Sequence, residues 1–222
     1  NVSLYNQNPK GAIDPTPTVA MVGLIEDPAH ITTQWFKNEG DAILLIGAPV
    51  DSDDAYQGLG GSAYLKVRHG MKKGLPPRCD LNVEKKIHDA LRGWIAQGAV
   101  QSAHDCSEGG LAVTLAECCI SGESARHTPH LLGAEVQLKN SNCGRLDALL
   151  YGETQGRIVI SVPSVFVGKI IGQAELLEIP VHKIGTVGGH SLSIEVSDQR
   201  FEWNLSEVHD TWFNSINRIM ES

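Results

Sequence analysis

Residues 103–111 run Ala-His-Asp-Cys-Ser-Glu-Gly-Gly-Leu and join two segments of different periodicity. The segment before this stretch is the apolar end of an expected strand. After it, Leu111, Leu115 and Cys119 recur every four residues, which is the spacing of one helix face. A strand that passes into an amphipathic helix through polar residues and glycines is typical of α/β and α+β domains. We therefore predict an α/β (α+β) fold.

Apolar runs and amphipathic segments alternate along the rest of the chain. The clearest element is a helix expected over residues 81–97, where apolar residues recur at every fourth position: Val83, Ile87, Leu91 and Ile95. Asp80 suits the N-cap of this helix, and Gly98 suits the position after its end. The other expected elements are strands at 42–47, 133–138, 156–162, 181–186 and 191–196, and helices at about 165–177 and 205–220.

The expected final helix carries an apolar stripe. Its members are Leu205, Val208, Trp212, Ile216 and Ile219. Apolar residues at this spacing usually form the side of a helix that packs into the core. We therefore expect the stripe to be core packing and not a cofactor site.

The composition limits the class of protein. The chain has 222 residues, of which 41% are hydrophobic, and its net charge is −8. Acidic excess argues against a general nucleic-acid-binding protein, because neutralising phosphates requires Lys and Arg. The sequence contains no apolar run of about 18 residues, so we predict no membrane span, and no secretory signal opens it. Because it opens on Asn1 and not on Met, we expect a fragment or a processed chain.

The cysteines indicate a reducing compartment. There are five of them, without a Cys-x-x-Cys pair: Cys79, Cys106, Cys118, Cys119 and Cys143. We expect them to be small buried hydrophobic residues. A structural zinc site needs four ligands at characteristic spacing, and the nearby His and Cys pairs, at 104/106 and 127/130, do not supply such a set.

The first part of the chain differs from the rest. Residues 7–17 are rich in proline and glycine, which is typical of a loop. Residues 19–25 then suggest a strand, whose ladder partners we expect upstream of Asn1. We place a boundary near residues 34–37 and predict that residues 1–36 are the tail of a preceding domain, followed by an α/β domain over 37–222.

The first candidate site is the 103–111 stretch. A helix N-terminus with glycines can bind phosphate through free backbone N–H groups. Asp105 could hold a magnesium ion that bridges phosphates, and Ser107 could donate to a phosphate. An ordinary capping loop, in which both side chains only satisfy backbone N–H groups, explains these residues equally well.

Three further segments are weaker candidates. Residues 58–62 (Gly-Leu-Gly-Gly-Ser) favour a tight turn before a helix over a phosphate loop. The acidic residues at 51, 53 and 54 favour a solvated loop over a metal site. Arg157, in the segment 152–157, could bind an anion, although an ion pair with Glu153 is favoured. At the start of the chain, Asn1 and Ser3 share one face if the backbone is extended.

Taken together, these motifs resemble one family. Five of them occur in the order found in phosphoribosylformylglycinamidine synthase, the formylglycinamide ribonucleotide amidotransferase of purine biosynthesis: residues 1–6 (NVSLYN), 15–25 (PTPTVAMVGLI), 59–62 (LGGS), 102–111 (SAHDCSEGGL) and 152–157 (GETQGR). The resemblance is to the C-terminal part of the small-type synthetase subunit, and it covers nearly the whole chain.

The resemblance implies a domain arrangement. The family belongs to the superfamily of aminoimidazole ribonucleotide synthetase and selenophosphate synthetase, and its subunit resembles a tandem duplication. Residues 1–36 would then be the last strands of the second N-terminal-type domain, which binds ATP and substrate. Residues 37–222 would be the second C-terminal-type domain, with an aminoimidazole ribonucleotide synthetase-like fold.

The resemblance also implies a reaction. The family uses ATP and Mg²⁺ to activate formylglycinamide ribonucleotide, and ammonia from glutamine then displaces phosphate to give the amidine. This makes it a carbon–nitrogen ligase of the cytoplasm, whose partners are a glutaminase subunit and a small bridging subunit. The family pattern Gly-Asn-Val-Ser assigns Asn1 to magnesium and Ser3 to the substrate. The catalytic histidine of the family lies in the other half of the subunit, so no catalytic residue is expected here and the chain should be inactive alone.

An auxiliary nucleotide site is the last implication. In large single-chain relatives, the segment similar to 104–107 holds a structural magnesium nucleotide, which would make Asp105 an auxiliary metal ligand and Ser107 a nucleotide ligand. His104 is expected to be a packed loop residue. Two alternatives remain: a non-catalytic scaffold that docks the partner subunits, or a selenophosphate or aminoimidazole ribonucleotide synthetase domain.

Overall fold

The computed structural model describes residues 2–4, 7–9, 11–12, 16–48, 54–122, 130–138 and 145–221. The chain divides into two compact units, Asn1–Ile31 and Thr32–Ser222. Each unit is described by itself below. Among the described residues, none of the helices is both long and apolar enough to cross a membrane.

The first unit consists of short strands. β1 (Val2–Leu4) pairs antiparallel with β4 (Thr16–Thr18), and β2 (Gln7–Asn8) pairs with β3 (Gly11–Ala12). A short 3₁₀ helix, η1 (Pro28–His30), follows. The strand expected at residues 19–25 is wrong, because the ladder ends at Thr18 and the following residues are exposed coil. An apolar run forms a strand only where a neighbouring strand can hydrogen-bond its backbone N–H and C=O groups.

Residues 32–36 belong to the second unit, so the observed division lies at 31/32 and not near residue 36. Phe36 is 3% exposed and packs in the core of the second unit. Thr33 forms a β-bridge with Ser102. That residues 1–36 are the tail of an N-terminal-type domain stays a prediction.

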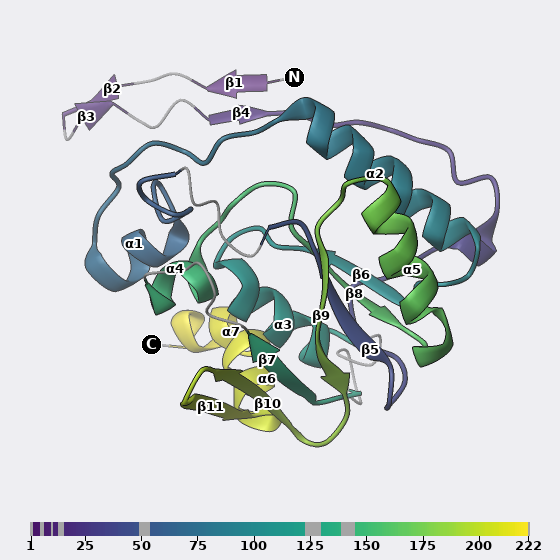
Figure 1. Ribbon diagram of the computed structural model, residues 1–222. Helices are drawn as coiled ribbons and strands as arrows, with labels where there is room; N and C mark the ends of the chain where they lie inside the picture. The colour runs from purple at the N-terminus through teal and green to yellow at the C-terminus, as the bar shows by residue number, and fades with distance from the viewer. Residues whose placement is uncertain are drawn as a thin grey trace. The chain divides into compact units, whose positions relative to one another are not determined.

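The second unit is built on a mixed seven-stranded sheet (Figure 1). Its strands lie in the order β11 (Gln199–Asn204), β10 (Ser191–Val196), β7 (Ala134–Leu138), β9 (Val181–Val187), β5 (Ala42–Ile46), β8 (Ile158–Val162) and β6 (Ser102–Asp105). β10 and β7 are parallel, and the other neighbours are antiparallel. The strands predicted for this unit are present. β11, which the sequence analysis did not predict, extends one edge.

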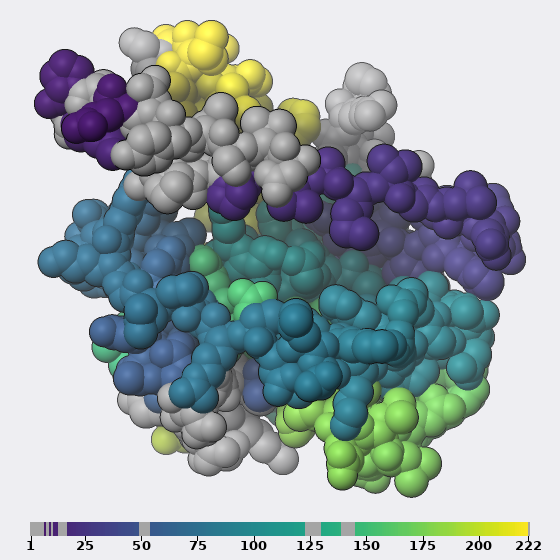
Figure 2. Space-filling model, turned by 90° about the horizontal axis from the view of Figure 1, so that it is seen from above, coloured from purple at the N-terminus to yellow at the C-terminus, as the bar shows by residue number. Residues whose placement is uncertain are grey.

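Helices cover both faces of this sheet. α2 (Leu81–Ala96) and α5 (Ser164–Leu176) pack on one face, and Figure 2 shows their side chains next to each other. α3 (Gly110–Ile120), α4 (Leu146–Tyr151) and α6 (Leu205–Phe213) pack on the other. β5 contributes side chains to the hydrophobic cores on both faces of the sheet. Ile43 and Leu45 lie in the core beneath α3, and Leu44 and Ile46 lie in the core beneath α2. The predicted α/β (α+β) class is confirmed.

Local sequence signals place α2 accurately. Asp80 is the N-cap, and its Oδ1 accepts a hydrogen bond of 2.9 Å from the backbone N–H of Asn82. Beyond the helix, Gly98 adopts a left-handed φ of +67°. On the inner side of α2, Trp94 is buried and its indole N–H donates to Gln173 of α5 at 2.9 Å.

The prediction for the C-terminal helix is wrong in two respects. The helix is divided at Asn214 into α6 and a short α7 (Ser215–Met220). The apolar stripe is not buried as a whole: Leu205 is 1% exposed, but Trp212 is 41% and Ile216 72% exposed. The stripe has the right period, but α6 meets the rest of the unit mainly through its first two turns, where it packs on α3 and β11.

Candidate functional site

Three of the predicted segments line one cleft of about 520 Å³ in the second unit. They are the glycine-rich turn at 58–62, the loop at 105–108 and the segment at 153–157. Pro76 and Pro77, from the connection that precedes α2, also line the cleft, as do Glu84 and His88 of α2. Most of the wall is polar backbone and side chain, so the cleft suits a polar ligand.

Strand pairing brings the second and third segments together. β6 and β8 are antiparallel, with Asp105 at the end of β6 opposite Ile158 at the start of β8. The loop that follows β6 and the segment that precedes β8 therefore lie at the same edge of the sheet. The backbone N–H of Cys106 donates to the carbonyl of Arg157 at 2.9 Å and extends this pairing into the loop.

Glu153 ties the glycine-rich turn to the other two segments. Its Oε1 accepts hydrogen bonds of 2.8 Å from the backbone N–H of Ala63, at the start of α1 (Ala63–His69), and from that of Gly109. Its own N–H donates to the carbonyl of Gly58 at 2.8 Å. A carboxylate that accepts from backbone N–H groups forms strong, charge-assisted hydrogen bonds. Glu153 was expected only as a partner of Arg157.

Among the residues that the structure describes, Arg157 is the largest of the fully buried side chains. One of its terminal nitrogens donates to the carbonyl of Gly152. Burial lowers the pKa of the Arg157 guanidinium, while the nearby Glu153 favours its charged form. This cation lies beneath the cleft, where it holds the backbone that turns into β8.

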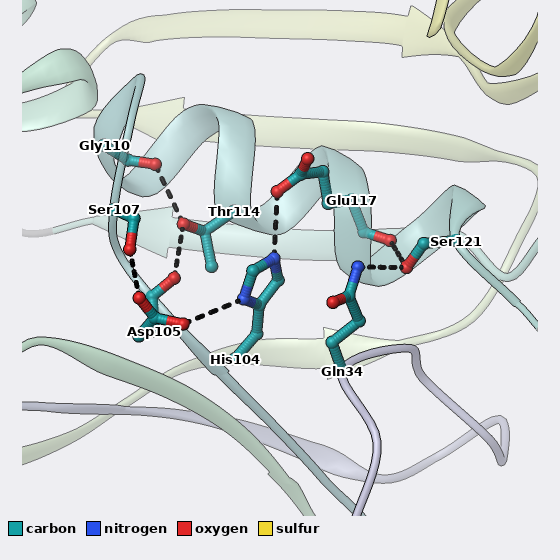
Figure 3. Close-up of polar contacts among 8 residues, drawn as sticks. All are labelled: Gln34, His104, Asp105, Ser107, Gly110, Thr114, Glu117 and Ser121. Carbon is teal, nitrogen blue, oxygen red and sulfur yellow. Dashed lines mark hydrogen bonds and ion pairs between the residues drawn. The ribbon is translucent and has the colours of Figure 1, made fainter. Parts of the chain in front are cut away.

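Asp105 and Ser107 both line the cleft. The Ser107 hydroxyl donates to the Asp105 carboxylate (Figure 3). Neither side chain caps α3, whose N-cap is Gly109, so the structure does not support the alternative of an ordinary capping loop. Partial burial opposes the charge of Asp105, but hydrogen bonding from Ser107 and the proximity of His104 outweigh it and lower the pKa of Asp105. A charged carboxylate therefore lies beside a hydroxyl at the cleft wall.

His104 lies between two carboxylates (Figure 3). Its Nε2 is 2.9 Å from Oε2 of Glu117 on α3, and its Nδ1 is 3.6 Å from Oδ1 of Asp105. Burial disfavours the charged imidazolium, but the hydrogen bond and charge of Glu117, together with the charge of Asp105, raise the pKa of His104. His104 is packed and hydrogen-bonded as expected, but it lies in β6 and not in a loop.

We expect His104→Gln to destabilise the chain more at about pH 6 than at about pH 9. A histidine whose pKa is raised in the folded state contributes stability at low pH, and that contribution is lost as the pH rises through the folded pKa. Urea unfolding of both proteins at the two pH values measures the difference, with His190→Gln in an exposed turn as control. An equal loss at both pH values would contradict the assignment.

Two candidate residues are not placed by the structure. Asn1 lies outside the described residues, and of Ser3 only the backbone in β1 is described. Residues 51 and 53 of the acidic loop also lie outside them. Asp54, in contrast, accepts hydrogen bonds from the N–H groups of Tyr56 at 2.9 Å and Gly58 at 2.7 Å, so it stabilises the glycine-rich turn.

Three of the four described cysteines match the prediction that they are buried, and Cys79 does not. Cys106, Cys118 and Cys119 are buried, whereas Cys79 is exposed and Cys143 lies outside the described residues. Burial raises the pKa of the Cys106 thiol. Within the described ranges, no group of three or more His, Cys, Asp or Glu side chains could hold a metal ion.

Sequence reasoning missed Glu84 and His88 of the cleft wall. Their side chains are one helical turn apart on α2, with Nε2 of His88 3.6 Å from Oε2 of Glu84. The only signal was their i, i+4 spacing, which is common on exposed helix faces.

Comparison with known proteins decides the family. The family model "AIR synthase related protein, C-terminal domain" matches residues 38–197. The chain belongs to this family. The curated relative "Phosphoribosylformylglycinamidine synthase subunit PurL" from Thermoanaerobacter sp. (strain X514) is 38% identical over 222 residues, which are 100% of this chain and 28% of the relative. The resemblance found in the sequence is thereby confirmed.

Solved structures share the fold of this family member. "T. maritima PurL complexed with FGAR" has a TM-score of 0.66 at 17% identity and covers 82% of this chain and 30% of its own. "T. maritima PurL complexed with ATP" has a TM-score of 0.60 at 16% identity, with 82% and 28% covered. The chain thus spans less than a third of the length of these relatives.

Proposed function

We propose that this chain is the C-terminal part of an ATP-dependent carbon–nitrogen ligase, which converts formylglycinamide ribonucleotide and glutamine-derived ammonia to the amidine in purine biosynthesis. The family membership and the relatives named phosphoribosylformylglycinamidine synthase support this proposal. Within the ligase, the cleft of the second unit binds a magnesium nucleotide. The observation that carries this assignment is the meeting of three motif segments at one edge of the sheet.

The charges of the cleft favour a nucleotide that arrives with a divalent cation. Four acidic residues line the cleft: Glu84, Asp105, Glu108 and Glu153. The basic residues in its lining are Arg157 and His88. A bare triphosphate would be repelled by these carboxylates, whereas a magnesium complex carries less negative charge. The bound nucleotide of one relative, described as PurL complexed with ATP, supports the ligand class.

Asp105 and Ser107 fit such a complex. Magnesium is usually held by one or two carboxylates together with phosphate oxygens and water. The lowered pKa of Asp105 keeps its carboxylate ionised, and 68% of its side chain is exposed. Asp105 would ligate the ion, and Ser107 would exchange its bond to Asp105 for one to a phosphate. When bound, the ion would stabilise negative charge on the phosphates.

The remaining roles belong to the whole ligase. Asn1 would ligate magnesium and Ser3 would contact the ribonucleotide substrate, in a pocket that other parts of the enzyme complete. Those parts would supply the catalytic residues, so the 222-residue chain would be inactive alone. A glutaminase subunit and a small bridging subunit would be its partners, in the cytoplasm.

Isothermal titration of Mg-ATP into the 222-residue chain tests the cleft assignment. We expect saturable binding that Asp105→Asn weakens at least about tenfold, because a charged metal ligand is lost. Asp198→Asn, in the exposed β10–β11 turn, is the matched control and should bind like the parent. Absence of heat at millimolar nucleotide would leave only the role of a non-catalytic scaffold.

A further inference from the structure

A second concavity lies between α3 and α6. It has a volume of about 460 Å³ and is lined mainly by apolar atoms. Ala112, Ala116 and Ile120 of α3 form one wall, Val208 and Trp212 of α6 form the other, and Leu192 of β10 lies at its base. This groove shares none of its lining residues with the cleft.

Aromatic rings surround the groove. Trp203 of β11, Trp212 of α6 and Tyr151 at the end of α4 contribute to its lining. Trp212 is 41% exposed and belongs to the stripe that was expected to be buried, so part of this apolar stripe faces solvent here. The faces of Trp and Tyr rings attract cations through the negative charge of the π-system.

The charged residues of the groove are acidic. Glu117 of α3 and Glu207 of α6 line it, and none of its lining residues is Lys or Arg. Oε2 of Glu117 contacts Nε2 of His104, and the other carboxylate oxygen of Glu117 points away from the imidazole ring (Figure 3). Glu207 lies in the first turn of α6 and is exposed, which leaves its carboxylate able to meet a ligand.

We propose that this groove is a binding site for a small organic cation, in which an aromatic or aliphatic body carries a protonated amine. The body would lie against the apolar walls and the Trp rings, and the ammonium would contact Glu207 and the ring faces. The volume falls within the range of small-molecule pockets. Anionic ligands such as nucleotides are disfavoured by the two carboxylates, which separates this site from the proposed function of the cleft.

Three compounds that share a phenyl group and differ in charge test the proposal. Phenethylamine, 2-phenylethanol and 3-phenylpropanoate carry a positive, neutral and negative group on similar phenyl chains. Each is titrated into the ¹⁵N-labelled 222-residue chain while the indole N–H signals are followed, with Trp203→Phe and Trp212→Phe used for assignment. We expect the signals of Trp203 and Trp212 to shift, and phenethylamine to bind about fivefold to tenfold more tightly than the alcohol.

A pair of variants tests the role of the carboxylate. Glu207→Gln should reduce the preference for the amine over the alcohol at least about threefold. Glu175→Gln, at an exposed position of α5 on the opposite face of the sheet, should leave that preference unchanged. Equal binding of amine and alcohol, shifts confined to other Trp signals, or a preference that survives Glu207→Gln would overturn the proposal. The parent spectrum, retained in each variant, establishes that it is folded.

Discussion

Replacing Gly110 with alanine is expected to lower the free energy of unfolding of this chain by about 3 kcal/mol. Gly110 opens α3 with a left-handed φ of +66°. A Cβ at this position would lie 2.6 Å from the carbonyl oxygen of Gly152 and 2.8 Å from the carbonyl carbon of Tyr151. Both atoms are backbone, so no side chain can rotate away, and the close approach of α3 to the 152–157 segment would be lost.

Gly70 supplies a matched control. Its φ is +65°, nearly that of Gly110, but a Cβ there would meet nothing within 4 Å. Gly70→Ala should therefore cost only about 1 kcal/mol, the part due to the left-handed backbone. Urea unfolding of the two variants measures the difference. Equal losses would show that the packing around Gly110 is not as tight as the structure indicates.

Replacing Glu153 with alanine is the second change with a large expected effect. It removes the acceptor for the N–H groups of Ala63 and Gly109, both bonded at 2.8 Å. Hydrogen bonds to a charged group contribute about 1.5–3 kcal/mol each, and water will replace part of that. We expect a loss of about 2–3 kcal/mol in the free energy of unfolding, together with loss of Mg-ATP binding, because the glycine-rich turn is no longer held against the loop at 105–108.

Glu153→Gln separates the hydrogen bonds from the charge. Its amide oxygen can still accept from the same N–H groups, so it should retain more than half of the stability that Glu153→Ala loses. Urea unfolding and titration calorimetry on both variants check this order. If Glu153→Ala unfolds like the parent, Glu153 does not join the three segments in the way described.

The parts of the fold that the sequence predicted are those set by local signals. α2 was predicted to within one residue because its capping residue Asp80, its four-residue apolar period and Gly98 all lie within or next to the helix. Buried strands such as β5 were also predicted, since both of its faces are covered and the run is continuously apolar.

The errors concern segments whose structure depends on distant partners. An apolar run at residues 19–25 suggested a strand, but the ladder of β1 and β4 ends before it. The stripe on α6 and α7 has a helical period, yet period alone does not say which turns meet the rest of the domain. β11 was missed because its burial pattern is mostly exposed, and it is ordered by pairing with β10.

In the candidate site, too, features set by local sequence were predicted and those that depend on distant residues were not. The loop at 105–108 was singled out from its own residues, but its proximity to the 153–157 segment follows from the register of β6 and β8. The contribution of α2 to the cleft, through Glu84 and His88, had only their i, i+4 spacing as a local signal, and that spacing is common on exposed helix faces. The hydrogen bonds of Glu153 to Ala63 and Gly109 span 90 and 44 residues, so no window of sequence could reveal them.

The proposed function depends on the binding of a magnesium nucleotide in the cleft at the β6–β8 edge. Backbone amide shifts of the ¹⁵N-labelled 222-residue chain, recorded during titration with Mg-ATP, test it most directly. We predict saturable shifts at Gly61, Ser107 and Gly156, which line the cleft, and none at Leu192 and Val208 in the groove. Unchanged cleft amides at millimolar Mg-ATP, or shifts centred elsewhere, would contradict the account.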